Sequence, residues 1–390
     1  MSNRLSLNDN EYIELLLTIR DAGTPWNEVA AFINEEFDCN YSADKYRKDY
    51  YQLDNGIEEP SAYLDIEDAF AEAELNLKIK QQQARDTLTS ANALIRRAGR
   101  EDTIRELGLE VARLMNSKKQ LAPIKPIKSK QSDNVGILCI SDWHYGLAID
   151  NFYNKYDTDI AKRRIAQLRD RTISIIEKEH LKELVVLNLG DLISGRIHLP
   201  LRINSQIDAI TQIEEVSELL CEFINDLLSY VNIRYTSVID NHSRVEPNKK
   251  ESLQLESLCR ITDWYMEKRL EDAIKQNRLT IEKNEYGPDM TTFKVYNHKI
   301  IGVHGDKDKQ KTIISKLNNF TQGHQDLILS AHMHHFSADE SNETELYCNG
   351  SLMGTDDYAN DLRLNSNPSQ LLIVADTENV SKVIYKIKLD

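Results

Sequence analysis

The chain has 390 residues, which is enough for a large core and more than one domain. Its 41% hydrophobic and 28% charged residues are those of an ordinary water-soluble protein, but the net charge of −15 is the wrong sign for a protein that coats nucleic acid. The polar residues after Met1 predict no secretory signal, and no apolar run reaches the roughly 20 residues that span a bilayer. Five scattered cysteines without CxxC spacing argue against a disulfide framework or a zinc finger, so we expect a cytoplasmic protein.

Residues 1–60 are predicted to form a small all-α unit of three short helices. Asn8 or Asp9 can cap the first helix, Gly23-Thr24-Pro25 separates it from the second, and residues 43–53 form the third. Basic residues beside tyrosines in the third helix are typical of a helix-turn-helix module that binds DNA. The acidity of residues 1–75 favours a helical protein-binding domain instead, and both interpretations stay open.

Residues 61–133 are predicted to be a helical arm followed by a basic linker. Apolar residues recur at helical spacing, at Leu88, Ala91, Ile95, Ala98, Ile104, Leu107, Val111 and Leu114. Residues 76–130 carry 13 Lys and Arg against 5 Asp and Glu, and the prolines at 123 and 126 indicate an extended linker. The arm is either an oligomerising or DNA-tracking element or an amphipathic connector that packs on its neighbour.

From about residue 134 strands alternate with long helices, which predicts an α/β catalytic domain over residues 134–390. Helices are expected at 157–182, 205–230 and 251–276. Strands are expected at 135–141, 184–189, 235–239, 292–296, 299–303, 326–329, 345–347, 370–374 and 382–387.

Five polar motifs follow successive predicted strands. They are Ser141-Asp142-Trp143-His144, Gly190-Asp191, Asp240-Asn241-His242, His304-Gly305 and Ala331-His332-Met333-His334. In an open α/β sheet, ligands bind beyond the carboxyl ends of the strands, so we expect these motifs to converge. Carboxylates combined with imidazoles suit Mn²⁺, Fe²⁺ or Zn²⁺ better than Ca²⁺. The pattern predicts two adjacent divalent cations bridged by Asp191, a centre able to cut phosphate esters.

In this order the motifs resemble those of the calcineurin-like metallophosphoesterases, whose pattern is Asp-x-His, Gly-Asp, Gly-Asn-His-Asp/Glu, His and Gly-His-x-His. The resemblance covers about residues 134–390 and implies two packed β-sheets flanked by helices, an αββα sandwich. It implies two divalent metal ions, with Mn²⁺ expected first and Fe²⁺, Zn²⁺ or Mg²⁺ as alternatives. The first would be held by Asp142, His144, Asp191 and His334, and the second by Asp191, Asn241, His304 and His332.

The resemblance also implies catalytic roles. His242 would face the substrate phosphate, where it stabilises charge or protonates the leaving oxygen, and a metal-bound hydroxide would be the nucleophile. The acidic residue that usually follows this histidine is absent, since Ser243 and Arg244 come next. We expect Arg244 to clamp a phosphate oxygen instead. Ala331 replaces the glycine of the last motif and keeps both ligands.

The Asn-His-x-Arg sequence and residues 193–198 resemble phage-encoded members grouped with DNA repair exonucleases. DNA phosphodiester cleavage is therefore the first hypothesis, in the cytoplasm of a bacterium or a phage-infected host. A phosphoprotein or nucleotide phosphatase is the enzymatic alternative, which the overall acidity favours. A non-catalytic scaffold that docks DNA or protein is the third, motivated by the missing acid. Expected partners are DNA but no membrane, with a homo-oligomer through residues 61–120 and an ATPase partner as further possibilities.

Overall fold

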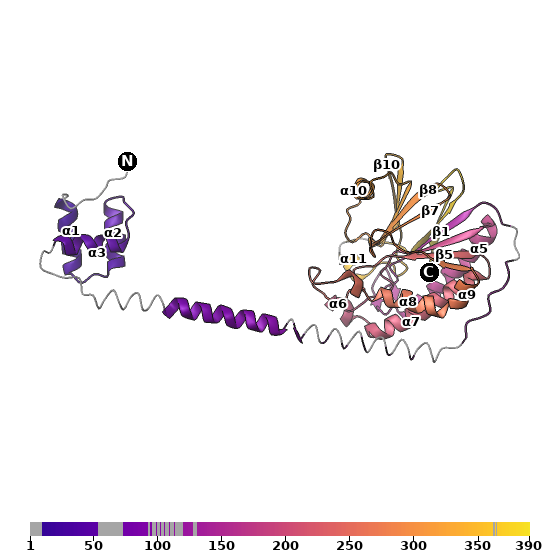
Figure 1. Ribbon diagram of the computed structural model, residues 1–390, viewed down its shortest axis with the longest axis horizontal. Helices are drawn as coiled ribbons and strands as arrows, with labels where there is room; N and C mark the ends of the chain where they lie inside the picture. The colour runs from indigo at the N-terminus through magenta and orange to yellow at the C-terminus, as the bar shows by residue number, and fades with distance from the viewer. Residues whose placement is uncertain are drawn as a thin grey trace. The chain divides into compact units, whose positions relative to one another are not determined.

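The computed structural model describes residues 10–53, 73–92, 94–95, 99, 102, 105, 109, 113, 120–127, 131–361, 363 and 365–390. The chain divides into two compact units, Met1–Arg97 and Ala98–Asp390 (Figure 1). None of the described helices is long and apolar enough to cross a membrane.

The first unit contains the three predicted helices. They are α1 (Asn10–Asp21), α2 (Trp26–Glu36) and α3 (Ala43–Leu53). Pro25 precedes α2, where its fixed φ and missing N–H suit a helix start. Tyr12 of α1, Ile33 of α2 and Tyr46 of α3 are fully buried against one another, so each helix contributes one apolar face to a shared core.

Two of the three cations on α3 are paired with acids of the same helix. Lys45 contacts Asp49, and Arg47 contacts Asp44. These ion pairs reduce the positive charge that α3 offers to a polyanion. DNA binding by this unit stays a prediction.

The described part of the predicted arm is helical over residues 73–92. Leu88 and Ile95, two of its apolar positions, are 63% and 69% exposed. The remaining apolar positions of the arm from Ala98 to Leu114 lie outside the described residues.

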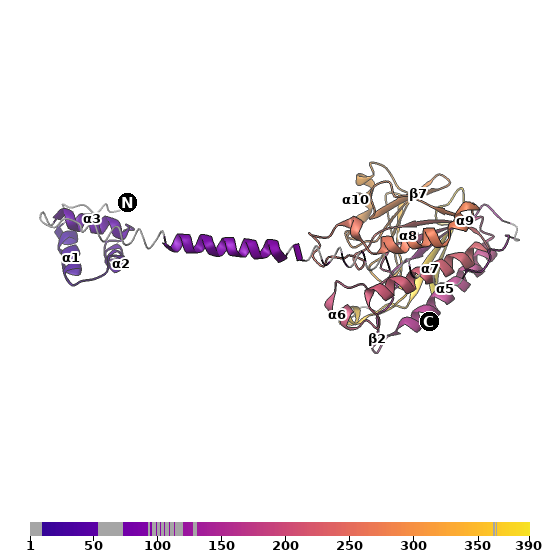
Figure 2. The ribbon, with the colours of Figure 1, turned by 60° about the horizontal axis from the view of Figure 1, so that its bottom comes forward.

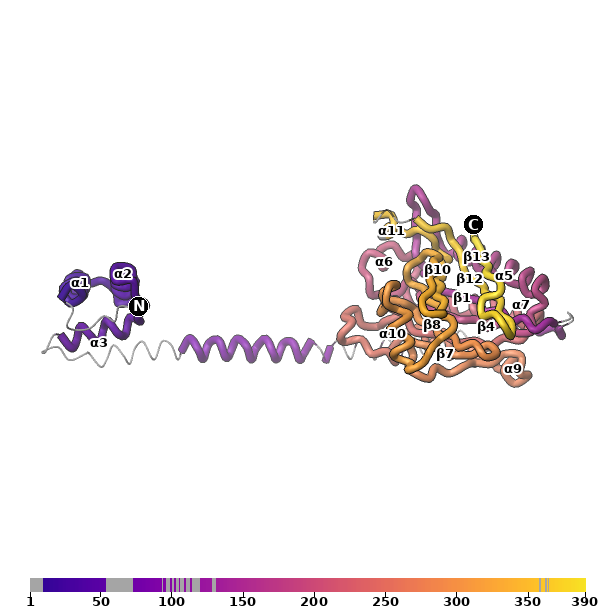
Figure 3. Tube along the Cα trace, turned by 90° about the horizontal axis from the view of Figure 1, so that it is seen from above, coloured from indigo at the N-terminus to yellow at the C-terminus, as the bar shows by residue number. Residues whose placement is uncertain are grey.

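The second unit is built on two large sheets. The first has the strand order β13-β12-β1-β4-β5-β6. Its strands are β1 (Val135–Ile140), β4 (Glu183–Asn188), β5 (Asn232–Ser237), β6 (Leu279–Ile281), β12 (Ser369–Ala375) and β13 (Val383–Lys388). The four strands β1, β4, β5 and β6 run parallel, and β12 is antiparallel to β1, which it adjoins in Figure 3.

The second sheet has the order β10-β11-β9-β8-β7. Its strands are β7 (Met290–Val295), β8 (His298–Val303), β9 (Leu327–Ser330), β10 (Ser337–Ser341) and β11 (Thr344–Cys348). Strands β8, β9 and β11 are parallel neighbours, so their carboxyl ends lie at one edge of this sheet.

The two sheets pack face to face, as the alternation of side chains along the strands shows. In β1, Ile137 and Cys139 enter a core shared with Leu329 of β9, whereas Leu138 and Ile140 enter a core shared with the helices. The outer face of the first sheet is covered by α5 (Thr158–Glu179), α7 (Ala209–Leu228) and α8 (Cys259–Arg269), which lie side by side in Figure 2. The outer face of the second sheet is covered by α10 (Ile313–Phe320). This αββα sandwich confirms the predicted fold class.

The predicted helix over 251–276 is wrong in extent. The structure has a 3₁₀ turn, η1 (Gln254–Glu256), then α8 and a short α9 (Glu271–Lys275). The N–H of Leu258 donates to the carbonyl of Ser243, 2.8 Å away, and Ser257 is extended, so α8 starts only at Cys259. Several short elements were not predicted from the sequence: β2 (Ile149–Asp150), β3 (Lys155–Tyr156), α6 (Leu199–Ile203), β6, β10, α10 and α11 (Asp357–Asp361).

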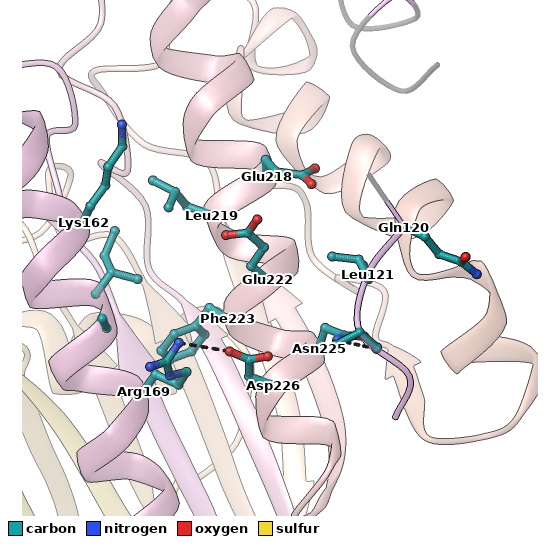
Figure 4. Close-up of a pocket in the computed structure, with 13 residues that line it drawn as sticks. Gln120, Leu121, Lys162, Arg169, Glu218, Leu219, Glu222, Phe223, Asn225 and Asp226 are labelled. Atoms are coloured by element: carbon teal, nitrogen blue, oxygen red, sulfur yellow. Dashed lines mark hydrogen bonds and ion pairs between the residues drawn. The ribbon is translucent and has the colours of Figure 1, made fainter. Parts of the chain in front are cut away.

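Residues 120–127 form neither helix nor strand, and they pack on the helices of the second unit. Asn225 Nδ2 of α7 donates to the carbonyl of Ala122 at 3.0 Å, and the N–H of Lys125 donates to Ser229 Oγ at 3.2 Å. Beside this segment α5 and α7 line a hollow of about 690 Å³ whose lining residues include Phe223 (Figure 4). None of the predicted metal ligands lines this hollow.

Candidate metal centre

The loops that follow β1 and β4 continue side by side beyond the strands. The N–H of Asp142 donates to the carbonyl of Gly190 and that of His144 to the carbonyl of Asp191, both at 3.0 Å. A parallel bridge between Tyr145 and Ile193 follows. The pairing of β1 with β4 thus continues into the loops beyond the sheet. It brings the predicted motif that contains Asp142 and His144 next to Gly190-Asp191.

Five of the seven predicted metal ligands have a strained backbone conformation. Positive φ angles occur at Asp142 (51°), His144 (44°), Asp191 (53°), His332 (70°) and His334 (58°). Non-glycine residues rarely adopt this conformation, which persists only where the surrounding structure imposes it. At Gly190 (φ 93°) a Cβ would lie 2.5 Å from Cβ of Asp240, so this position also requires glycine for close approach.

The seven predicted metal ligands gather in two groups that share one carboxylate. Asp142, His144, Asp191 and His334 offer ligand atoms within 4.8 Å of one another, and so do Asp191, His304 and His332. Asn241 Oδ1 lies 2.8 Å from His304 Nε2, which adds the predicted amide to the second group. Asp191 is therefore common to both groups.

The donor atoms fit divalent cations. Asp142 Oδ1, Asp191 Oδ2 and His332 Nδ1 are buried and make no hydrogen bond to the described residues. Nδ1 of His304 lies 2.7 Å from the carbonyl of Leu189, which fixes the ring so that its Nε2 faces Asp191. Buried carboxylate oxygens and oriented imidazole nitrogens are ligands for Mn²⁺, Fe²⁺ or Zn²⁺.

The electrostatics of the group keep its two carboxylates ionised. Burial alone would raise the pKa of Asp191, but His242 and His304 outweigh it, and the pKa lies well below its ordinary value. Burial would also raise the pKa of Asp142, but the hydrogen bond and charge of His334 outweigh it, and the pKa of Asp142 is lowered. Burial lowers the pKa of His304, but the Asp191 carboxylate outweighs it and raises this pKa to about 10. Both carboxylates are thus ionised, which is the form in which they bind a cation.

His242 and Arg244 lie beside the two groups. Nδ1 of His242 is 2.9 Å from the carbonyl of Ser194, and its Nε2 is 3.8 Å from Asp191 Oδ2. Arg244 Nε donates to the carbonyl of Asn241 at 2.9 Å, while its buried Nη1 has no hydrogen-bond partner within the described part of the chain. Nε2 of His242 therefore faces the ligand cluster, and beside it a buried guanidinium nitrogen of Arg244 has no partner among the described residues.

An acid does hold the turn of the third motif, but from the position before Asn241. Asp240 accepts hydrogen bonds from the N–H of Ser243 at 2.6 Å and from its hydroxyl at 2.9 Å. Burial and the neighbouring Asp191 raise the pKa of Asp240 to about 7. The carboxylate absent after His242 is thus replaced by one that fixes the loop carrying both Asn241 and His242.

A buried network that the sequence analysis did not assign supports Asp142. The Ser141 hydroxyl donates to Asp142 Oδ2 at 2.6 Å and accepts from Asn349 Nδ2 at 2.8 Å. Gln370 Oε1 accepts from the N–H of Ser141, and the Ser351 hydroxyl donates to the carbonyl of Asp142. The sequence does offer one sign of this network: Asn349 and Gln370 are polar residues just after β11 and inside β12. Polar side chains in a buried core need hydrogen-bond partners.

Two further histidines flank the motifs. The ring of His198 lies 5.1 Å from that of His242, so it borders the site. Nδ1 of His335 bonds to the carbonyl of Met333 at 2.8 Å.

No protein-family model matches the chain. The chain is 25% identical over 354 residues to the SPbeta prophage-derived uncharacterized protein YonJ of Bacillus subtilis, covering 86% of this chain and 85% of that protein. Similar solved structures include a novel archaeal phosphodiesterase (15% identity, 65% of this chain and 99% of the other, TM-score 0.33). Another is Vps29 from Entamoeba histolytica complexed with zinc (13% identity, 65% and 98%, TM-score 0.33). At these TM-scores the fold assignment rests on the sheets and helices described above.

The αββα sandwich and the clustered carboxylates and imidazoles support a metal-dependent phosphoester hydrolase. The prophage relative agrees with the expected phage origin of the sequence.

Proposed function

We propose that this protein is a metal-dependent phosphodiesterase that cleaves DNA. The observation that carries the proposal is the shared position of Asp191 in two adjacent ligand groups. A carboxylate held between two cations offsets their mutual repulsion. Two such cations polarise a phosphate ester and lower the pKa of bound water, which is the chemistry of phosphodiester hydrolysis.

The residues around this centre have complementary tasks. With Nδ1 of His242 held at the carbonyl of Ser194, its Nε2 faces the ligand cluster and can give a proton to the leaving oxygen. The free Nη1 of Arg244 can bind a non-bridging phosphate oxygen, because guanidinium forms strong hydrogen bonds to phosphate. Asn241 and His304, which contact each other, hold the other side of the site.

Arginines near the ligand cluster favour a nucleic-acid substrate over a phosphoprotein. Arg196 and Arg244 lie in the two loops that carry Ser194 and His242. The overall charge of −15 requires that DNA approach through such a local basic surface. Most of the basic residues between 76 and 130 lie outside the described part of the chain.

The proposal is tested by Mn²⁺-dependent cleavage of end-labelled single- and double-stranded DNA, with a phosphomonoester run in parallel. We expect cleavage that EDTA abolishes and that Asp191→Asn loses. His242→Ala should lower turnover by roughly 10²- to 10⁴-fold while the protein still binds metal. DNA left intact beside rapid monoester turnover would instead identify a phosphatase, and inactivity on both would favour the docking scaffold.

A further inference from the structure

A second hollow, of about 430 Å³, adjoins the candidate metal centre on the side of α6 and the start of α7. Its floor is aliphatic, and its rim carries two arginines. The apolar lining residues are Ile207, Ala209, Ile210, Ile213, Val245 and Leu258. We call this hollow the Arg196/Arg202 groove, after Arg196 and Arg202 on its rim. Its volume is within the range of ligand-binding pockets.

Both arginines of the groove are exposed, and neither guanidinium makes a hydrogen bond or ion pair with any residue that the structure describes. Asp208 is the acid among the lining residues, and its carboxylate accepts hydrogen bonds from the N–H groups of Ile210 and Thr211 and from the Thr211 hydroxyl. Its charge is therefore directed at the start of α7. The rim offers two free guanidinium groups to an anion.

The groove touches the candidate site directly. Gly195, which lines it, has φ 72°, and a Cβ there would lie 2.1 Å from the carbonyl oxygen of His242. Val245, which also lines the groove, directly follows Arg244 in the chain. Gly195 thus joins the groove to the loop that carries His242, so a ligand in the groove would lie next to the residues of the candidate site.

We propose that the Arg196/Arg202 groove binds the nucleotide that adjoins the cleaved bond of a nucleic-acid strand. The guanidinium groups bind its phosphate, and the aliphatic floor packs against its sugar and base. This inference rests on the proposed phosphodiesterase function and adds a substrate subsite to it. Planar guanidinium groups also stack on bases, which agrees with an arginine rim above an apolar floor.

The test compares the wild type with the double variant Arg196→Ala/Arg202→Ala on two substrates. Bis(p-nitrophenyl) phosphate reports on the metal centre alone, whereas an end-labelled oligodeoxynucleotide also needs the groove. We expect kcat/KM on the oligonucleotide to fall by roughly tenfold or more, chiefly through KM. The slope of log kcat/KM against log salt should become shallower by about 0.7 per lost phosphate contact. Turnover of the small diester should not change.

The charge-matched control is Lys294→Ala/Lys299→Ala, which removes two exposed lysines paired across β7 and β8. Lys299 lies at the start of β8, and His304 follows the other end of that strand. The control should behave as the wild type on both substrates. Equal losses on both substrates in the arginine variant, or no loss on the oligonucleotide, would overturn the subsite. A wild type that cleaves the small diester but no oligonucleotide would overturn it as well, while leaving a phosphodiesterase centre in place.

Discussion

Ser141 connects a predicted metal ligand to the buried core. Its hydroxyl both donates to Asp142 Oδ2 and accepts from Asn349 Nδ2. Ser141→Ala should lower the affinity for Mn²⁺ by roughly 10- to 100-fold, because groups that orient a ligand usually matter to this extent. Isothermal titration calorimetry with Mn²⁺ measures the effect.

The matched control is Ser217→Ala, which removes a buried serine hydroxyl that donates to Thr262 on the helical face. It should bind Mn²⁺ as the wild type does. Equal affinities in the wild type and in Ser141→Ala would show that Ser141 has no part in positioning Asp142.

At the scale of single residues, the sequence was sufficient to predict the metal ligands but not the residues that hold these ligands in place by hydrogen bonds. Asp142, Asp191 and His304 each follow a strand end in a recognisable order, and parallel strands bring such positions together. The role of Gln370 could not be predicted, because it depends on the pairing of β12 with β1, which joins segments more than 200 residues apart. The role of Asp240 as a turn acid was missed for a similar reason: it depends on the geometry of the loop.

The element α7 begins at a side-chain cap that gives it a pH-dependent stability. Asp208 accepts from the N–H groups of Ile210 and Thr211, and these bonds together with the Thr211 hydroxyl outweigh burial and lower the pKa of Asp208. A lowered folded-state pKa stabilises the protein above the unfolded value of about 3.9. This contribution is lost as the pH falls through the folded-state pKa.

Asp208→Ala should therefore reduce the free energy of unfolding by about 1 kcal/mol at neutral pH. The difference from the wild type should shrink as the pH falls below about 4. Urea unfolding at several pH values measures both. Asp208→Asn keeps a good cap without a titrating group, so its stability relative to the wild type should improve in acid. A difference between Asp208→Ala and the wild type that is constant with pH would contradict the assignment.

At the scale of elements, periodicity was informative for long, strongly patterned segments and weak elsewhere. The expected helix over 157–182 and α5 differ by only a few residues. The segment 251–276 has helical spacing, but the hydrogen bond from Leu258 to Ser243 holds its first part outside the helix. Strands of two or three residues, such as β2 and β6, are too short to produce a period.

At the scale of the whole molecule, the attachment of residues 120–127 to α7 decides where the second unit can be cut. Leu121 and Ile124 pack against the helical core, so a fragment that starts at Gln120 keeps these contacts, whereas one that starts at Asn134 loses them. We expect the fragment 120–390 to hydrolyse bis(p-nitrophenyl) phosphate as the full chain does. Its cleavage of DNA should be weaker and less dependent on salt if the removed residues contact DNA. Equal losses on both substrates would contradict a DNA-binding role for the residues before Gln120.

The central claim is that Asp191 is shared by two cations. The most direct measurement is the Mn²⁺ content after equilibrium dialysis, combined with electron paramagnetic resonance to detect magnetic coupling between neighbouring ions. The account predicts that the wild type binds a magnetically coupled pair of Mn²⁺ ions and that Asp191→Asn loses both the coupling and at least one ion. A single uncoupled ion in the wild type, or an unchanged coupled pair in Asp191→Asn, would contradict it.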